Sequence, residues 1–185
     1  TWVPPSVVLP GVYSNNDAVA QEWFAPAGLN RGGLTEVLEA QTRLTHSERD
    51  DLYENRINPI ATFPGQGVVV FGQKTLHPVS SALDRVNVAR LICYLRYQFD
   101  QLAKPFLFEL NDRMTRDQVT DTFERFLADL ASKRALYDFL VVCDDSNNTA
   151  TRIDANQMWI DVAIQPAKAA EFIYIPVSYT HLRAH

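Results

Sequence analysis

The stretch SALDRVNVARLICYLRYQFDQLAKP, residues 81–105, decides the fold because it predicts the central helix. Its apolar residues recur at intervals of three and four, which places them on one face of a helix. Ser81 followed by Asp84 resembles a capping box at the start, and Pro105 cannot continue the helix. The predicted apolar face consists of Val88, Leu91, Ile92, Leu95, Phe99 and Leu102.

Two further helices are expected on either side of this one. Thr115 and Gln118 are placed to cap a second amphipathic helix. Thr45 and Glu48 form the T-x-x-E capping box of a shorter helix upstream. The apolar face of the second helix would consist of Val119, Phe123, Phe126, Leu127 and Leu130.

Segments rich in β-branched and aromatic residues alternate with these helices and predict strands. Pro64-Gly65 separates two of them, INPIATFPG (57–65) and GVVVFGQKT (67–75). FLFEL (106–110) and LYDFLVVC (136–143) predict two more, the latter buried, and residues 153–177 predict another two. The alternation indicates an α/β class, with a mixed β-sheet packed against two main amphipathic helices.

The first 17 residues do not show the pattern of an amphipathic helix or of a core strand. TWVPPSVVLPGVYSNND (1–17) holds three prolines, which favour an extended connector or an edge strand. Asn16 or Asp17 could then cap a short helix, AVAQEW (18–23).

The amino-acid composition favours a globular domain and disfavours a membrane-spanning or nucleic-acid-binding protein. The 185 residues are 46% hydrophobic and 21% charged, with a net charge of -5, as in ordinary globular domains. No apolar run approaches the roughly 20 residues that span a bilayer, so membrane insertion is not expected. The two cysteines form neither a disulfide framework nor a zinc site and favour a reducing environment. No basic stripe is interleaved with aromatics, which disfavours direct nucleic-acid binding.

One enzymatic hypothesis joins GVVVFGQKT with the end of FLVVCDD (139–145). The first resembles a phosphate-binding G-x-x-x-x-G-K-[ST] loop, and the second resembles a strand that ends in a magnesium-binding carboxylate. Gln73, however, separates Gly72 from Lys74, and the four residues before Gly72 are stiff β-formers. The pattern therefore favours a core strand, and a nucleotide-dependent α/β enzyme stays the alternative.

Without that loop, Asp144 and Asp145 are best interpreted as the start of a polar turn that Asn147 and Asn148 support. A divalent-cation site made by Asp144, Asp145 and Asn147 stays open, although the spacing lacks the glycine and distal glutamate of a calcium loop. His181 and His185 are four residues apart, but no third metal ligand accompanies them.

EFIYIPV (171–177) is apolar, prone to β-structure and near the end of the sequence. It could be an internal edge strand. It could also be a strand offered to another subunit, because a terminal strand with unpaired N–H and C=O groups can join a neighbouring sheet.

Several segments taken together resemble the C-terminal part of the tail sheath protein of contractile-tailed bacteriophages. The resemblance runs from Trp2 to about Ile175. Its segments are WVPPS, GVYSNNDAVAQEWFAPAGLNRGGL, LYENRINPIATFPGQGVVVFGQKTL, SALDRVNVARLICYL, LYDFLVVCDDSNNT and IDANQMWIDVAIQPAKAAEFIYI. Related contractile injection machines of bacteria use similar sheaths.

The resemblance implies a domain division and a mechanical function. Residues 1–78 would end an upstream sheath domain and connect it, residues 79–177 would form the conserved C-terminal domain, and residues 178–185 would be a non-native or disordered tail. The protein would be a structural subunit of the virion tail sheath, made in the host bacterial cytoplasm, without catalytic residues, metal or cofactor. Its six-fold rings would stack around the tail tube and contract, driving the tube through the host envelope for genome delivery.

The resemblance also implies partners and a contact strand. The partners would be identical sheath subunits, the tail tube protein, and the baseplate and tail terminator proteins. The strand donated to a neighbour would be Glu171, Phe172, Ile173, Tyr174, Ile175, Pro176 and Val177.

Overall fold

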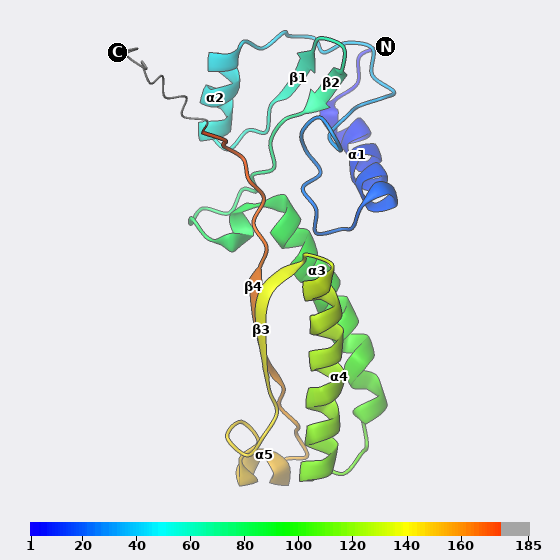
Figure 1. The fold of residues 1–185 in the computed structure, drawn as a ribbon, viewed down its shortest axis with the longest axis vertical. Coiled ribbons are helices and arrows are strands. Elements are labelled where there is room, and N and C mark those ends of the chain that lie inside the picture. Colours follow the sequence, from blue (N-terminus) through cyan, green and yellow to red (C-terminus); the bar gives the residue numbers. More distant parts are fainter. Residues whose placement is uncertain (175–185) are drawn as a thin grey trace, which may run out of the picture.

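The structure, a computed structural model, describes residues 1–174, which form an elongated molecule with two lobes (Figure 1). The upper lobe contains α1 (Pro5–Val19), α2 (His46–Glu54), β1 (Ile60–Phe63) and β2 (Gly67–Val70). The lower lobe contains α3 (Val86–Ala103), α4 (Arg113–Ser132), β3 (Leu136–Val142), α5 (Ala150–Asp154) and β4 (Asp161–Pro166). Two short 3-10 turns, η1 (Ala82–Asp84) and η2 (Lys104–Phe106), flank α3. The expected mixture of helices and strands is confirmed, and its strands form two separate antiparallel pairs.

The two long helices and the β3–β4 hairpin enclose the main core. α3 and α4 run side by side in opposite directions, and α4 packs against β3 (Figure 1). The apolar faces predicted for both helices point into this core, where the rings of Phe99 and Phe123 lie 5.3 Å apart. The fully buried members are Trp23, Leu91, Leu95, Val119, Phe123, Leu127, Leu130, Ala135, Leu136, Val141 and Cys143.

The hairpin of β3 and β4 has one buried face and two open edges. Val141 pairs with Val162, and Leu140 with Ala163, in an antiparallel register that shifts between Leu136 and Asp138. The strand predicted at 136–143 is confirmed, but its Leu140 side chain is 60% exposed, so only one face is buried. No third strand joins this sheet within residues 1–174, so its outer edges keep unpaired backbone groups.

The upper lobe folds as its turn signals predict. β1 and β2 pair antiparallel across a turn in which Gly65 has a φ of 75°, a conformation that glycine adopts without steric cost. Val68 and Val70 of β2 pack with Val12 and Leu34 in a second, smaller core. The capping box of α2 is confirmed, with Thr45 and Glu48 bonded reciprocally.

Two expectations for the chain near its prolines were wrong. Residues 5–19 form a helix rather than an extended connector, and the helix expected at 18–23 does not form because α1 ends at Val19. Pro5 occupies the first turn, where the missing N–H has no helical partner, so it suits a helix start. Pro10 removes one interior bond, but Val12 and Asn16 are almost wholly buried, and their packing holds the helix together.

Other boundaries also differ from the sequence pattern. FLFEL forms η2 and a turn rather than a strand, and Phe108 has a φ of 70°. Asp112, not Thr115, caps α4 by accepting a hydrogen bond from the Thr115 N–H at 2.8 Å. Ser81 caps η1 rather than α3. Residues 153–174 supply one strand, β4, so the second strand expected there does not form within the described chain.

Candidate functional site

The segment that follows β4 is fastened to the upper part of the molecule by one carboxylate. It leaves the hairpin at Pro166 and runs upward beside α2 (Figure 1). There Glu171 accepts a hydrogen bond from Arg85 Nε at 2.7 Å and another from Gln73 Nε2 at 3.2 Å. Arg85 directly precedes α3, and Gln73 follows β2, so three distant parts of the chain meet at one side chain. We call these contacts the Glu171 clamp.

The charge of Glu171 outweighs the effect of burial and favours the ionised form of Arg85. The Glu171 side chain is 16% exposed and the Arg85 side chain 28%. Burial lowers the pKa of Arg85, but the hydrogen bond and attraction of Glu171 raise it more, and the net shift is upward. Burial, followed by a hydrogen bond to Glu171, raises the pKa of Tyr53 in α2. The charged Arg85 guanidinium therefore lies 2.7 Å from the Glu171 carboxyl group, in a partly buried contact.

Replacing Tyr53 by phenylalanine tests this electrostatic arrangement. The folded-state pKa of Tyr53 lies above the value of about 10 for an unfolded tyrosine, so its stabilising effect is full below about pH 10 and falls as pH rises further. We therefore expect the stability of Tyr53→Phe to decline less steeply above pH ~10 than that of the parent. Denaturant unfolding at several alkaline pH values measures this slope. Tyr97→Phe, at an exposed tyrosine, is the control, and equal slopes for both variants would contradict the assignment.

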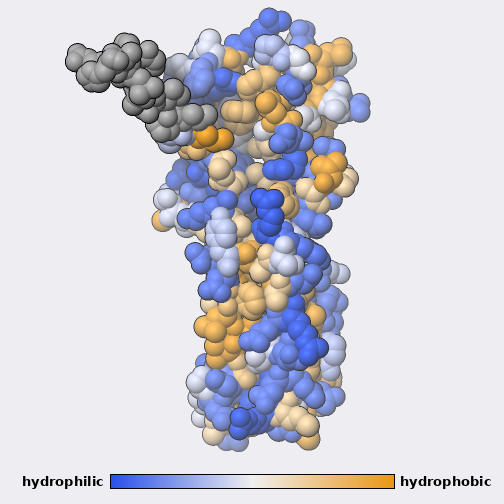
Figure 2. Space-filling view, viewed as in Figure 1, coloured by the Kyte–Doolittle hydropathy of each residue, from blue (hydrophilic) through white to orange (hydrophobic). Residues whose placement is uncertain are grey.

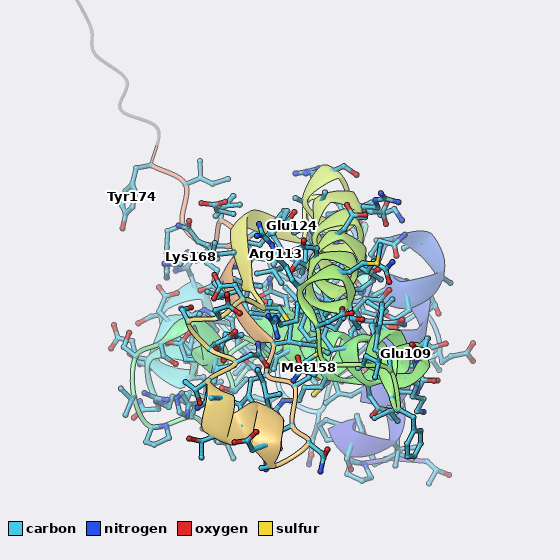
Figure 3. The ribbon with its side chains drawn as sticks, turned by 90° about the horizontal axis from the view of Figure 1, so that it is seen from below. Glu109, Arg113, Glu124, Met158, Lys168 and Tyr174 are labelled. Carbon is cyan, nitrogen blue, oxygen red and sulfur yellow. The ribbon has the colours of Figure 1, made fainter. Side chains whose placement is uncertain are left out.

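Beyond the clamp, the segment projects from the body. Phe172, Ile173 and Tyr174 are 65%, 80% and 89% exposed, and they pair with no strand in residues 1–174. Figure 3 shows Tyr174 at the periphery, away from the helices. Ile175, Pro176 and Val177 lie outside the described residues. In the predicted contact strand, Glu171 therefore attaches the segment to the body, and the next three residues expose apolar side chains.

Sequence reasoning missed the partners of this anchor. Arg85 and Gln73 lie 86 and 98 positions from Glu171, and neither belongs to a motif that links them. The one available signal is that Glu171 is the single acid in an apolar run.

The geometry of residues 67–75 does not support a phosphate-binding loop. Val68, Val69 and Val70 are buried in β2, which pairs with β1, and the Val70 N–H donates to the Gly32 carbonyl at 2.8 Å. Gln73 is buried in the clamp. The Lys74 amine donates to the Tyr53 carbonyl and lies 4.1 Å from the Tyr53 ring centre, so it is committed to α2.

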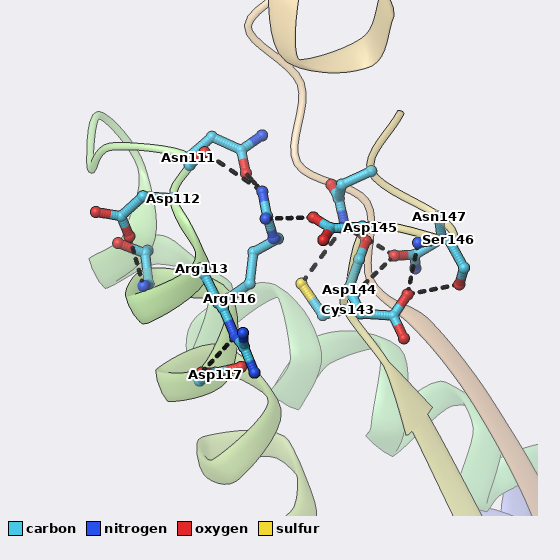
Figure 4. Close-up of polar contacts among 12 residues, drawn as sticks. Asn111, Asp112, Arg113, Arg116, Asp117, Cys143, Asp144, Asp145, Ser146 and Asn147 are labelled. Carbon is cyan, nitrogen blue, oxygen red and sulfur yellow. Dashed lines mark hydrogen bonds and ion pairs between the residues drawn. The ribbon is translucent and has the colours of Figure 1, made fainter. Parts of the chain in front are cut away.

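Asp144 and Asp145 belong to a structured turn at the far end of β3 (Figure 4). Asp145 Oδ1 lies 2.7 Å from Arg116 Nη2, and the buried Arg116 also donates to Asn111 Oδ1 at 3.0 Å. Hydrogen bonds from Ser146 lower the pKa of Asp144. Asn147 donates to the Val142 carbonyl at 2.7 Å. The two aspartates therefore close the strand and attach it to the start of α4.

Asn148 completes the same turn. Its amide donates to the Trp159 carbonyl at 3.0 Å and accepts from the Trp159 N–H at 2.7 Å. Within residues 1–174, no group of three or more His, Cys, Asp or Glu side chains is arranged to hold a metal ion. None of the helices described is long and apolar enough to cross a membrane.

Comparison with known proteins identifies relatives over almost the whole chain. The phage tail sheath protein of Vibrio phage KVP40 is 40% identical over 172 residues, covering 93% of this chain and 26% of that protein. The tail sheath protein of Enterobacteria phage T4 is 36% identical with the same coverage. The chain thus spans about a quarter of the length of the curated relatives it matches.

Solved structures agree with these relatives. The sheath complex of an extracellular contractile injection system (PVC), in its contracted state, superposes with a TM-score of 0.87 at 27% identity, over 95% of this chain and 51% of that one. The contracted helical sheath of the anti-feeding prophage (AFP) gives 0.83 at 26% identity, over 95% and 50%. These relatives are sheath proteins rather than enzymes, and the nucleotide-enzyme hypothesis has no support. The family model named phage tail sheath C-terminal domain matches residues 79–180, and the chain belongs to that family.

Proposed function

We propose that this chain forms the C-terminal part of a contractile tail sheath subunit. The observation that carries the proposal is the likeness to tail sheath proteins over 93% of the chain. The subunit would polymerise as stacked six-fold rings around a tail tube and contract to drive that tube through the host envelope. It would be made in the host cytoplasm and reside in the virion tail, with baseplate and tail terminator proteins as its neighbours at the two ends.

Within this proposal, residues 79–177 act as the conserved sheath domain, and residues 1–78 connect it to an upstream domain. Two features of the fold support self-assembly. Within residues 1–174 the β3–β4 sheet leaves both outer edges open, and three exposed apolar residues follow Glu171. A strand added to an open edge satisfies its backbone groups while apolar side chains find a surface to cover.

We further propose that residues 171–177 are the segment donated to a neighbouring subunit, with the body ending at Glu171. The rigid body would be the lower lobe, in which two helices and a hairpin share one core. A subunit that keeps such a core and changes only its contacts can pass between two lattices without unfolding.

Deletion of residues 172–177 tests both the sheath function and strand donation. The experiment uses a sheath protein that has the full length of the relatives and carries this sequence as its C-terminal part. The parent should form sedimentable tubes, and the deletion should leave soluble subunits because the connecting strand is gone. Negative-stain images and sedimentation measure the outcome.

Two point variants sharpen the test. Ile173→Pro removes a backbone donor and should weaken polymerisation, whereas Ile173→Val keeps it and should not. Normal tubes from the deletion would refute strand donation. Absence of tubes from the parent would instead refute the sheath function.

A further inference from the structure

A groove of about 870 Å³ lies between the two lobes, beside the Glu171 clamp. Its walls come from the segment after α1, from α2, from the chain after β2 and from the last described residues. Trp23, Phe24, Phe71 and Phe172 give it an aromatic lining. A groove of this size and lining is suited to receive a few apolar side chains.

Cations without acidic partners surround the groove. Arg31, Arg49, Arg134 and Lys168 all line it, and none lies within 4.0 Å of an acidic oxygen in residues 1–174. The groove also contains two acids, Glu171, which pairs with Arg85, and Asp50, which lies 2.9 Å from the His46 ring, so its four cations outnumber them. A chain with a net charge of -5 therefore concentrates positive charge at one place.

Aromatic rings hold these guanidinium groups in position. Arg31 and Arg134 lie 5.3 and 5.7 Å from the centre of the Phe24 ring. Arg49 lies 5.6 Å from the Phe71 ring. A stacked guanidinium keeps its edge available for a carboxylate and loses little side-chain freedom when it binds one.

The lining favours an occupant that carries both a carboxylate, which would pair with the cations, and apolar side chains, which would pack against the aromatic rings. A polypeptide segment that combines an acid with apolar side chains has this chemistry.

The corner between α3 and α4, residues 107–110, offers that combination at the opposite end of the lower lobe. Leu107, Phe108 and Leu110 are 63%, 106% and 77% exposed, an unusual concentration of apolar surface on one turn. Glu109 lies between them, without an ion pair in residues 1–174, and Figure 3 shows it at the rim of this end. Figure 2 shows that much of the surrounding surface is hydrophilic.

We propose that the groove is a socket for the 107–110 corner of a second copy of this chain, with Glu109 facing Arg31, Arg49 and Arg134. The inference rests on the proposed self-assembly and adds a second contact, which shares only Phe172 and Glu171 with the proposed donated strand. Because the corner and the groove are different surfaces, the contact is head-to-tail, and such a contact propagates into rings or helical stacks.

Exchanging the charges of Glu109 and Arg134 tests whether the corner pairs with the groove. The variants are made in a full-length sheath protein that carries this sequence. Glu109→Arg and Arg134→Glu should each lower the yield of tubes by about tenfold or more, because each places like charges together. The double variant should recover most of the yield. Phe108→Ser, which removes the apolar contact without adding charge, should also lower the yield. Glu124→Arg, at an exposed acid of α4 outside the corner, is the control and should assemble like the parent.

The possible outcomes separate this inference from the proposed function. Parent-like tubes from both single reversals, at unchanged subunit stability, would overturn the socket while leaving the sheath function intact. Loss in both singles without recovery in the double variant would also overturn it, since another part of the sheath protein would then occupy the groove. A parent that forms no tubes refutes the proposed function itself.

Discussion

Phe123→Ala should lower the free energy of unfolding by about 3–5 kcal/mol, because it removes a large side chain from the tightest part of the core. Phe123 is 2% exposed and lies where α4 meets α3, with its ring against Phe99. Each kcal/mol lowers the melting temperature of a domain of this size by about 2–4 °C, so a decrease of about 10 °C is expected. Chemical denaturation followed by circular dichroism measures the change.

An exposed residue of the same type provides the matched control. Phe108→Ala removes the same atoms at a side chain that is fully exposed, so its effect should stay within about 0.5 kcal/mol. A similar loss for both variants would show that the α3–α4 contact is not the main source of stability.

The second large effect is expected at the clamp. Glu171→Ala leaves Arg85 partly buried without its acceptor, and breaking a fully buried ion pair by removing one partner costs about 3–5 kcal/mol. Because the Arg85 side chain is 28% exposed, we expect a smaller cost, about 2–3 kcal/mol. This loss should mainly favour local detachment of residues 167–174, which the clamp attaches to the body.

Hydrogen exchange distinguishes this local effect from general destabilisation. The Ala167 and Lys168 amides, which donate to the Ala135 carbonyl and the Tyr137 hydroxyl, should exchange roughly 30-fold faster in Glu171→Ala, which corresponds to about 2 kcal/mol, while those of α4 change little. Lys168→Ala, in the same segment but with an exposed side chain, should leave exchange nearly unchanged. Removing Arg85 as well, by Arg85→Met, should recover part of the loss because no charge is then left unpaired. Uniformly faster exchange in both lobes would argue against a local clamp.

The parts of the fold that local sequence specifies were predictable. The spacing of Val88, Leu91 and Leu95 identified the buried face of α3, since a helix of that period can bury only one stripe. Thr45 and Glu48 identified the start of α2 because their mutual hydrogen bonds need no distant partner. The inserted Gln73 argued against a phosphate loop, and the structure places that residue in the clamp.

Features that depend on distant contacts were not predictable in the same way. Pro10 and Pro5 suggested an extended chain, but burial of Val12 and Asn16 against the upper lobe outweighs the lost hydrogen bond. FLFEL has strand-forming residues, yet it pairs with no strand within residues 1–174. The role of Glu171 depends on Arg85, and only the folded chain brings the two together.

The clamp also determines where a mechanical load enters the subunit. Along the chain, Glu171 stands between the exposed residues that follow it and the end of β4 at Pro166. Tension applied at Phe172 therefore reaches Glu171 first and passes through Arg85 to the first turn of α3. The helix pair, in which the Phe99 and Phe123 rings pack together, would then carry part of the pull that would otherwise fall on the β3–β4 hairpin alone. A neighbour that pulled on this segment would turn the whole lower lobe as one lever rather than unravel it.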